Sequence, residues 1–164
     1  EWLWGGTAAG WRGRSLGRRG AGGRGGGPPP PVDLAAERRN GDFVRARILA
    51  GAVRACHDCA DGGLLVTLAE MAMETGIGAI LAPAPAGIPP HAFWFGEDQG
   101  RYVVAVPDAA GFIAAATAAG VPAARLGQTG GGDLVLASGQ SISVAALRAA
   151  NEATLPALME GRSA

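Results

Sequence analysis

Apolar residues recur at helical spacing in two stretches of the first half of the chain, and each stretch predicts an amphipathic helix. The first covers residues 33–50, with Asp33 as its N-cap and Gly51 as its C-terminal cap. The second covers residues 63–74, with Thr67 on the side facing away from the core. Its predicted buried face comprises Leu64, Leu65, Leu68, Met71 and Ala72. Both helices are therefore expected to pack one face against a common core.

Two further helices are predicted in the second half of the chain. Asp108 is placed as the N-cap of an alanine-rich helix over residues 109–119, whose small side chains suit close packing on a sheet. The last amphipathic helix covers residues 144–159 and is expected to be kinked or interrupted near Pro156, because proline lacks the amide proton that a helix interior needs.

Short β-prone runs separate these helices, and most are bounded by glycine or proline. A glycine turn at residues 129–132 predicts a hairpin between residues 123–128 and 133–137. The order of elements contains a β-α-β-β-α-β core with flanking helices, which predicts an α+β fold with a ferredoxin-like, split-βαβ sheet. The remaining predicted strands lie at residues 53–56, 76–81, 102–106 and 138–143.

The first 32 residues are rich in Gly, Arg and Pro and show neither a helical nor a strand period. Such a segment buries too little apolar area to offset its ordering entropy, so residues 1–32 are predicted to be disordered and residues 33–164 to form the domain. An RGG-like arm that binds RNA is one alternative. A GC-rich stretch read in the wrong frame is the other, and we favour unstructured or non-native sequence over an RNA arm.

Charge and composition exclude several classes of function. The chain has as many basic as acidic residues, but residues 33–164 hold the excess of acid, which argues against a nucleic-acid-binding surface. Every basic residue is Arg, which excludes phosphate-binding and Schiff-base lysines. No apolar run reaches the roughly 18 residues of a membrane span, and no signal peptide is evident, so a cytoplasmic protein is expected.

The clearest chemical signal is an acidic turn between the strand at residues 53–56 and the helix that follows. The turn holds His57, Asp58 and Asp61, and it ends in the pair Gly62 and Gly63. Glycines at a helix start let a ligand approach the free amide groups and the positive end of the dipole, which favours a phosphate. Asp58 and Asp61 are also candidate ligands for Mg²⁺, which prefers oxygen.

Structural interpretations of the same turn stay open. Asp61 is placed as a helix N-cap, and His57 as a residue that satisfies local backbone groups rather than a general base. Cys56 and Cys59 form a single CxxC pair, for which a zinc site would need two more ligands. We interpret both cysteines as core-lining or turn residues, and we assign no catalytic residue.

A second polar loop precedes the strand at residues 102–106. Glu97, Asp98, Gln99 and Arg101 stand between glycines there, which is typical of a binding loop. The alternative is a solvated turn in which Arg101 forms a surface ion pair with Glu97 or Asp98. The two polar loops are expected to meet on one rim of the sheet, where they would face a phosphorylated molecule.

Five sequence blocks resemble the C-terminal end of phosphoribosylformylglycinamidine synthase, in the domain similar to the C-terminal domain of aminoimidazole ribonucleotide synthetase. HDxxDGGL followed at the right distance by GEDQGRY is the most specific combination. The blocks are PPPVDLAAE at 29–37, AxHDxxDGGLxVxLAEMA at 55–72, GIGA at 76–79, FGEDQGRYVVxVP at 95–107 and GVPAxxLGxTGG at 120–131. The chain departs from the family's HDxSDGG at Ala60, which removes a hydroxyl group.

The resemblance implies a fragment of an ATP- and Mg²⁺-dependent ligase of purine biosynthesis. The family converts formylglycinamide ribonucleotide to formylglycinamidine ribonucleotide, with ammonia from a glutaminase subunit or domain. Its catalytic His and most Mg²⁺ ligands lie upstream of this stretch, so the fragment is expected to be inactive alone and to pack against the remaining domains. By the pseudo-symmetry of the family's two halves, the loop at Glu97, Asp98 and Gln99 would border an auxiliary nucleotide site.

Overall fold

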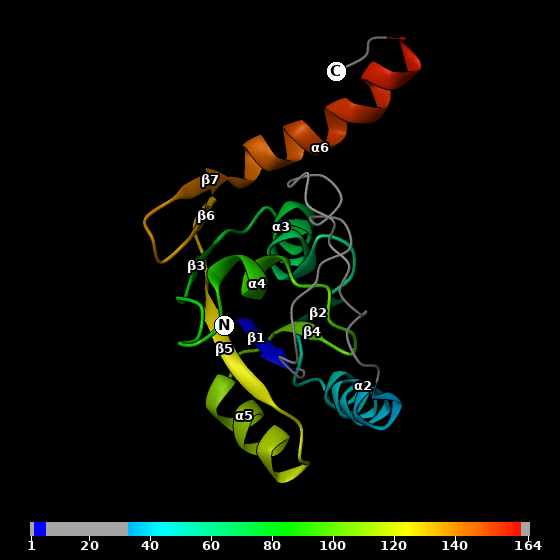
Figure 1. The fold of residues 1–164 in the computed structure, drawn as a ribbon, viewed down its shortest axis with the longest axis vertical. Coiled ribbons are helices and arrows are strands. Elements are labelled where there is room, and N and C mark those ends of the chain that lie inside the picture. The colour runs from blue at the N-terminus through cyan, green and yellow to red at the C-terminus, as the bar shows by residue number, and fades with distance from the viewer. Residues whose placement is uncertain (1, 6–32, 162–164) are drawn as a thin grey trace.

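The computed structural model describes residues 2–5 and 33–161, which form a twisted sheet with helices on both faces (Figure 1). The helices are α2 (Leu34–Leu49), α3 (Gly63–Thr75), α4 (Pro90–Phe95), α5 (Ala109–Ala118) and α6 (Val144–Met159). The strands are β1 (Trp2–Gly5), β2 (Ala55–Asp58), β3 (Ala79–Leu81), β4 (Tyr102–Ala105), β5 (Ala123–Thr129), β6 (Asp133–Val135) and β7 (Ser141–Ser143).

The sheet has seven strands in the order β2-β4-β1-β5-β3-β6-β7, so β2 forms one edge. Strands β3 and β6 are parallel, and the other neighbours are antiparallel. The predicted α+β class, a mixed sheet with flanking helices, is confirmed. Within it, β1 separates the pair β2-β4 from the pair β5-β3, so the N-terminal strand lies between the strands of the β-α-β-β-α-β core.

The prediction of disorder for residues 1–32 is wrong for Trp2–Gly5. This strand pairs with both β4 and β5, with Trp4 opposite Val103 on one side and Ala124 on the other. Four residues are too few to show a period, and the pairing partners lie far along the chain, so local sequence gave no signal for this strand. Residues 6–32 lie outside the described part, and the boundary at residue 32 stays a prediction.

The predicted hairpin between residues 123–128 and 133–137 is also wrong. The glycine turn is present, but β3 lies between β5 and β6. Gly127 and Gly78 make this insertion possible, since a Cβ at Gly127 would meet the Ile80 carbonyl oxygen at 2.2 Å and one at Gly78 would meet Asp133 backbone. The insertion of β3 between β5 and β6 therefore depends on close backbone contacts at these two glycines. A turn signal in the sequence does not reveal such contacts.

Helix ends follow the local signals. The Asp33 carboxylate accepts hydrogen bonds from the amides of Ala35 and Ala36 at 3.1 and 3.0 Å, and the Asp108 carboxylate accepts one from Gly111 at 2.9 Å. Gly51, with φ 72°, follows the last turn of α2. The predicted N-caps Asp33 and Asp108 are confirmed, whereas the C-cap of α2 is Ala50, one residue before the predicted Gly51.

Two hydrophobic clusters lie on opposite faces of the sheet. Successive residues of β4 separate them, because Val103 joins the cluster under α3 and α4, while Val104 joins the cluster under α2 and α5. Phe43 of α2 and Phe112 of α5 meet edge to face at 5.4 Å in the second cluster. Within residues 2–5 and 33–161, every helix is too short or too polar to cross a membrane.

Candidate functional site

Strand β2 extends further than the sequence predicts and takes in two residues of the acidic turn. His57 pairs with Val103 and Asp58 with Tyr102, so both residues belong to the edge strand rather than to the turn. The prediction that placed them in the turn is wrong, because pairing with β4 keeps the backbone extended past Cys56. Of the predicted set, only Asp61 and Gly62 lie between β2 and α3, and Gly63 is the first residue of the helix.

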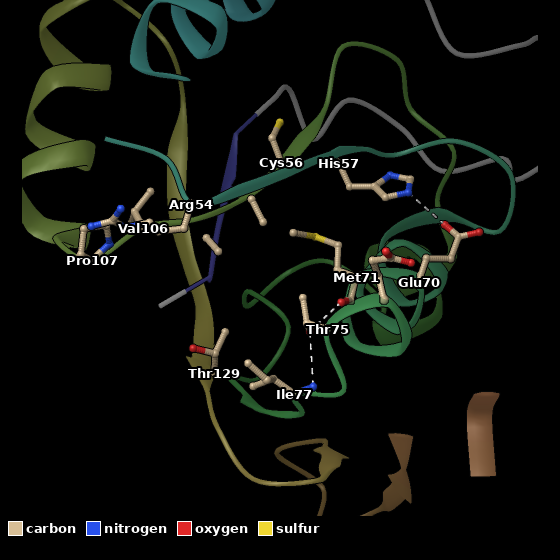
Figure 2. A pocket seen from close by; sticks show the side chains of 13 residues that line it. Arg54, Cys56, His57, Glu70, Met71, Thr75, Ile77, Val106, Pro107 and Thr129 are labelled. Carbon is tan, nitrogen blue, oxygen red and sulfur yellow. Dashed lines mark hydrogen bonds and ion pairs between the residues drawn. The ribbon is translucent and has the colours of Figure 1, made fainter. Parts of the chain in front are cut away.

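The His57 ring is half-buried and held by its neighbours. Its Nδ1 lies 2.7 Å from the carbonyl oxygen of Asp58, and its Nε2 lies 3.5 Å from Oε2 of Glu70 on α3. Figure 2 shows the ring directed at Glu70 across the gap between β2 and α3. The geometry agrees with the interpretation that His57 satisfies a local backbone group, and it adds a link to α3.

A cavity of about 690 Å³ opens beside this histidine, over the sheet and along α3 (Figure 2). Its lining includes Glu70, Glu74 and Met71 from α3 and Arg54, the residue before β2. The cavity lies on the side of His57 that faces α3. The contacts between the two polar loops lie at the other end of β2. The cavity and the loop contacts are therefore separate features.

The start of α3 is capped by another loop instead of by its own sequence. The N-cap is Gly62, in the left-handed region with φ 86° and without a side-chain cap, so the prediction of Asp61 as N-cap is wrong. The Gly62 amide donates instead to Oε1 of Glu97 at 2.9 Å. A carboxylate from the second loop thus meets the positive end of the helix, where a phosphate was expected.

Replacing Glu97 with alanine is expected to lower the free energy of unfolding by about 1–2 kcal/mol, the usual cost of losing a helix cap. Glu97→Gln keeps an acceptor for the Gly62 amide and removes only the charge, so about half of that loss is expected. Urea unfolding of both variants measures the difference. Equal stability of Glu97→Ala and the wild type would show that the contact contributes nothing.

Arg101 is the most buried charged residue described, with 2% of its surface exposed. Its guanidinium donates to the carbonyl oxygens of Gly96 and Asp98, and its Nη1 lies 3.7 Å from Oδ2 of Asp98. The predicted surface pair is therefore an ion pair in the interior. Arg101 fastens the loop from Gly96 to Gly100 onto itself, and its guanidinium is turned away from solvent.

The carboxyl group of Asp98 is buried, and its Oδ1 has no hydrogen-bond partner within the described part of the chain. Burial raises the pKa of Asp98, and the charge of Arg101 opposes that rise. The raised value means that the folded state holds this proton more tightly than the unfolded state does. Its contribution to stability is therefore present below the ordinary value of 3.8 and is lost as the pH rises through the raised folded-state pKa.

We accordingly expect the stability of the wild type, relative to Asp98→Asn, to increase as the pH falls through that window. Urea unfolding of the two proteins at a series of pH values from neutral to below 3.8 measures the change. Parallel stability curves for the two proteins would contradict a raised pKa at this carboxyl group.

The two polar loops meet, as the sequence predicts. Besides the bond from Gly62 to Glu97, the Cys59 amide donates to the Arg101 carbonyl at 2.9 Å. Gly63 touches the backbone of the second loop, since a Cβ there would lie 2.6 Å from the Gly96 oxygen. Asp58, Asp61 and Gln99 are exposed around this junction.

Sequence reasoning missed two buried polar residues whose side chains form hydrogen bonds to the backbone of the loop junction. Asn40 of α2, 2% exposed, donates to the Gly100 carbonyl at 3.2 Å. Thr67 of α3, predicted to face away from the core, is also buried, and its hydroxyl donates to the carbonyls of Asp58 and Gly63. A polar residue at a core position of the helical period was the available signal for Asn40, four residues after Ala36.

The geometry gives little support for a metal site or for a reactive cysteine thiol. Among residues 2–5 and 33–161, no group of three or more His, Cys, Asp or Glu side chains is arranged to hold a metal ion. Asp58 and Asp61 would therefore need further ligands from phosphate oxygens or water to hold Mg²⁺. Cys56 and Cys59 are free thiols, and burial raises the pKa of both, which disfavours the reactive thiolate.

The sequence matches the family described as "AIR synthase related protein, C-terminal domain" over residues 3–138, which is most of the chain. The chain belongs to this family. The AIR-synthase-related domain thus includes β1 through β6, and the matched range begins inside the N-terminal strand. Helix α6 lies beyond the matched range.

Relatives of this AIR-synthase-related domain are subunits of a much larger enzyme. The "Phosphoribosylformylglycinamidine synthase subunit PurL" of Acidiphilium cryptum (strain JF-5) is 61% identical over 122 residues, which is 74% of this chain and 17% of that protein. The protein of the same name from Bradyrhizobium sp. (strain ORS 278) is 54% identical over 161 residues, or 97% of this chain and 22% of that protein. The chain therefore spans about a fifth of these relatives.

Solved structures share the fold of this AIR-synthase-related domain at low identity. "T. maritima PurL complexed with FGAR" has a TM-score of 0.71 at 18% identity, covering 90% of this chain and 27% of that chain. "T. maritima PurL complexed with ATP" and "Structure of PurLQS from Thermotoga maritima" have TM-scores of 0.68 and 0.67 at 17% and 16% identity. Each of these two covers 90% of this chain and 25% of that chain.

Proposed function

We propose that this chain is the C-terminal region of a phosphoribosylformylglycinamidine synthase. The assembled enzyme would use ATP and Mg²⁺ to convert formylglycinamide ribonucleotide to formylglycinamidine ribonucleotide in purine biosynthesis, in the cytoplasm, with ammonia from a glutaminase subunit or domain. The identity of 54% over 161 residues with the Bradyrhizobium subunit carries this proposal. At that identity over nearly the whole chain, the two proteins share their fold.

The contribution of this chain to the reaction is structural. The polar side chains that hold the loop junction together, Arg101, Asn40 and Glu97, bind backbone groups of the chain itself. The His57 ring contacts Asp58 and Glu70, and neither contact presents a nucleophile. We therefore propose no catalytic residue here, and we expect the chain to be inactive by itself.

A chimera tests the assignment. In the Bradyrhizobium sp. (strain ORS 278) subunit, the stretch that matches this chain is replaced by residues 1–164, and the chimera is expressed in a bacterium that lacks its own synthase subunit. Growth without purines is expected for the chimera and not for residues 1–164 alone. The matched control is the Bradyrhizobium subunit with the same stretch deleted. A stable, abundant chimera that fails to restore growth would overturn the assignment, and growth with residues 1–164 alone would overturn the claim of inactivity.

We further propose that the junction of the two loops borders a nucleotide phosphate. The bond between Gly62 and Glu97 brings the two loops together, and Asp58, Asp61 and Gln99 are exposed residues of the segments that this bond joins, which supports this proposal. The Gly62 amide is already bonded to Glu97, so a phosphate would displace that carboxylate or bind beside it, with Mg²⁺ shared by Asp58 and Asp61. His57, Gly62 and Gly63 complete the proposed surroundings, and Arg101 holds the loop in place from the interior.

Thermal unfolding in the presence of increasing Mg-ATP tests the nucleotide site separately. A ligand that binds only the folded state raises the melting temperature in proportion to the logarithm of its concentration once the site is filled. We expect such a rise for residues 1–164, its loss in Asp58→Asn/Asp61→Asn, and its retention in Asp42→Asn, an exposed carboxylate of α2. An equal melting temperature with and without Mg-ATP would refute the site and leave the chimera result untouched.

A further inference from the structure

Helix α6 carries an apolar stripe of which only the first half is covered. Val144 is 4% exposed and Leu147 packs beside it on the cluster under α3. Leu155 and Leu158 continue the same face of the helix, since they follow Val144 and Leu147 at intervals that return to one side. Leu155, Leu158 and Met159 are 70%, 71% and 88% exposed. In Figure 1 this second half of α6 projects past α3 and away from the sheet.

The covered half of the stripe lies beside an apolar groove, which Leu147 helps to line. A cavity of about 530 Å³ lies between α3, α4, β7 and α6, lined by Leu65, Met73, Phe95, Ile142 and Leu147 among other residues. Ile142 on β7 is itself 47% exposed. Groove and helix together form a largely apolar surface, interrupted by Asn151, which also lines the groove. A folded protein in water rarely leaves an apolar surface of this kind uncovered.

The comparisons indicate what covers it. The family match ends at residue 138, before α6, whereas the Bradyrhizobium subunit matches 97% of the chain, which takes in α6. The helix is therefore shared with the large synthase subunits and lies outside the range that the domain family has in common. This chain corresponds to 22% of that subunit, so most of the subunit is available to cover the surface.

We propose that the second half of α6, with the adjoining groove, is the docking surface for another domain of the same synthase polypeptide. The inference rests on the proposed function. The covering surface would be apolar, because the exposed side chains of the stripe are leucine and methionine. It would contact Leu147 and Ile142 in the groove and extend along the stripe to Leu158.

Hydrogen exchange measured by mass spectrometry tests this in residues 1–164 alone and in the chimera. The amides of residues 152–160 are expected to exchange at least about tenfold more slowly in the chimera, where docking would suppress opening of the helix end. Leu155→Glu/Leu158→Glu should return the chimera's rate to that of the isolated chain. Because both side chains are exposed, this variant should leave the melting temperature of residues 1–164 unchanged.

Ala153→Glu provides the matched control. It adds a charge to the same helix at an exposed position on the opposite side from the stripe, so protection in the chimera should persist. Equal exchange in the chimera and in the isolated chain would overturn the proposal. A dimer of residues 1–164 in light scattering, dissociated by Leu155→Glu/Leu158→Glu, would also overturn it and identify a second copy as the occupant. Purine-free growth of the chimera reports on the proposed function independently of either result.

Discussion

Replacing Arg101 with methionine is expected to lower the free energy of unfolding by about 3–5 kcal/mol, the cost of removing one partner from a buried ion pair. The guanidinium is 2% exposed and bonds two carbonyl oxygens as well as the Asp98 carboxylate. Methionine fills much of the same volume but leaves those oxygens without a donor and the carboxylate without a counter-charge. Urea unfolding at neutral pH measures the loss.

Two comparisons make this expectation specific. Arg38→Met removes an arginine from an ion pair with Asp42 in which both side chains are largely exposed, so a loss below about 0.5 kcal/mol is expected. Arg101→Met/Asp98→Asn should lose less than the sum of its two single variants, because the second change removes the uncompensated charge. A loss below about 1 kcal/mol for Arg101→Met would mean that the pair behaves as a surface pair.

Replacing Gly63 with alanine is expected to lower the free energy of unfolding by roughly 2–5 kcal/mol. Its φ of 73° lies in the left-handed region, which costs a residue with a Cβ about 1–2 kcal/mol. The new methyl group would also meet the backbone of Phe95 and Gly96 at 2.6 Å. That overpacking adds about 1–3 kcal/mol, because neither neighbour can move aside as a flexible side chain would.

Gly76→Ala separates the two contributions. Gly76 ends the same helix with φ 72°, yet a Cβ there would meet nothing within 4 Å, so only the conformational cost of about 1–2 kcal/mol is expected. The difference between the two variants reports the contact between the loops. Equal losses from Gly63→Ala and Gly76→Ala would show that the second loop moves away from α3 at little cost.

The parts of the fold that local sequence encodes were predictable. A carboxylate before an apolar period marks the start of α2 at Asp33 and of α5 at Asp108, because the cap and the amides it satisfies are neighbours in the chain. The period itself identified four of the five residues predicted to be buried on α3, with Leu65 only half-buried. The meeting of the two loops was also expected, because both carry polar residues suited to face a phosphorylated molecule.

The remaining features depend on contacts between distant segments. Strand β1 is defined by β4 and β5, and the start of α3 is capped by Glu97 rather than by Asp61 beside it. The short helix α4 at Pro90–Phe95 was not predicted, because six residues after a proline-rich loop give no helical period. The burial of Arg101 was missed for a different reason. Its partners, Gly96 and Asp98, are near it in the sequence, but they bind it through backbone carbonyls, which a pattern of side chains does not record.

The position of β1 affects the order in which the chain can fold. Trp2 is synthesised before its partners Ala105 and Gly127, which lie much further along the chain. Before β4 and β5 are synthesised, β1 has no strand to pair with. If β4 and β5 then fold without β1, each presents an unpaired edge to the other across the width of one strand. Edges of this kind recruit other chains, so the growing polypeptide relies on rapid pairing of β1 with β4 and β5 to avoid aggregation.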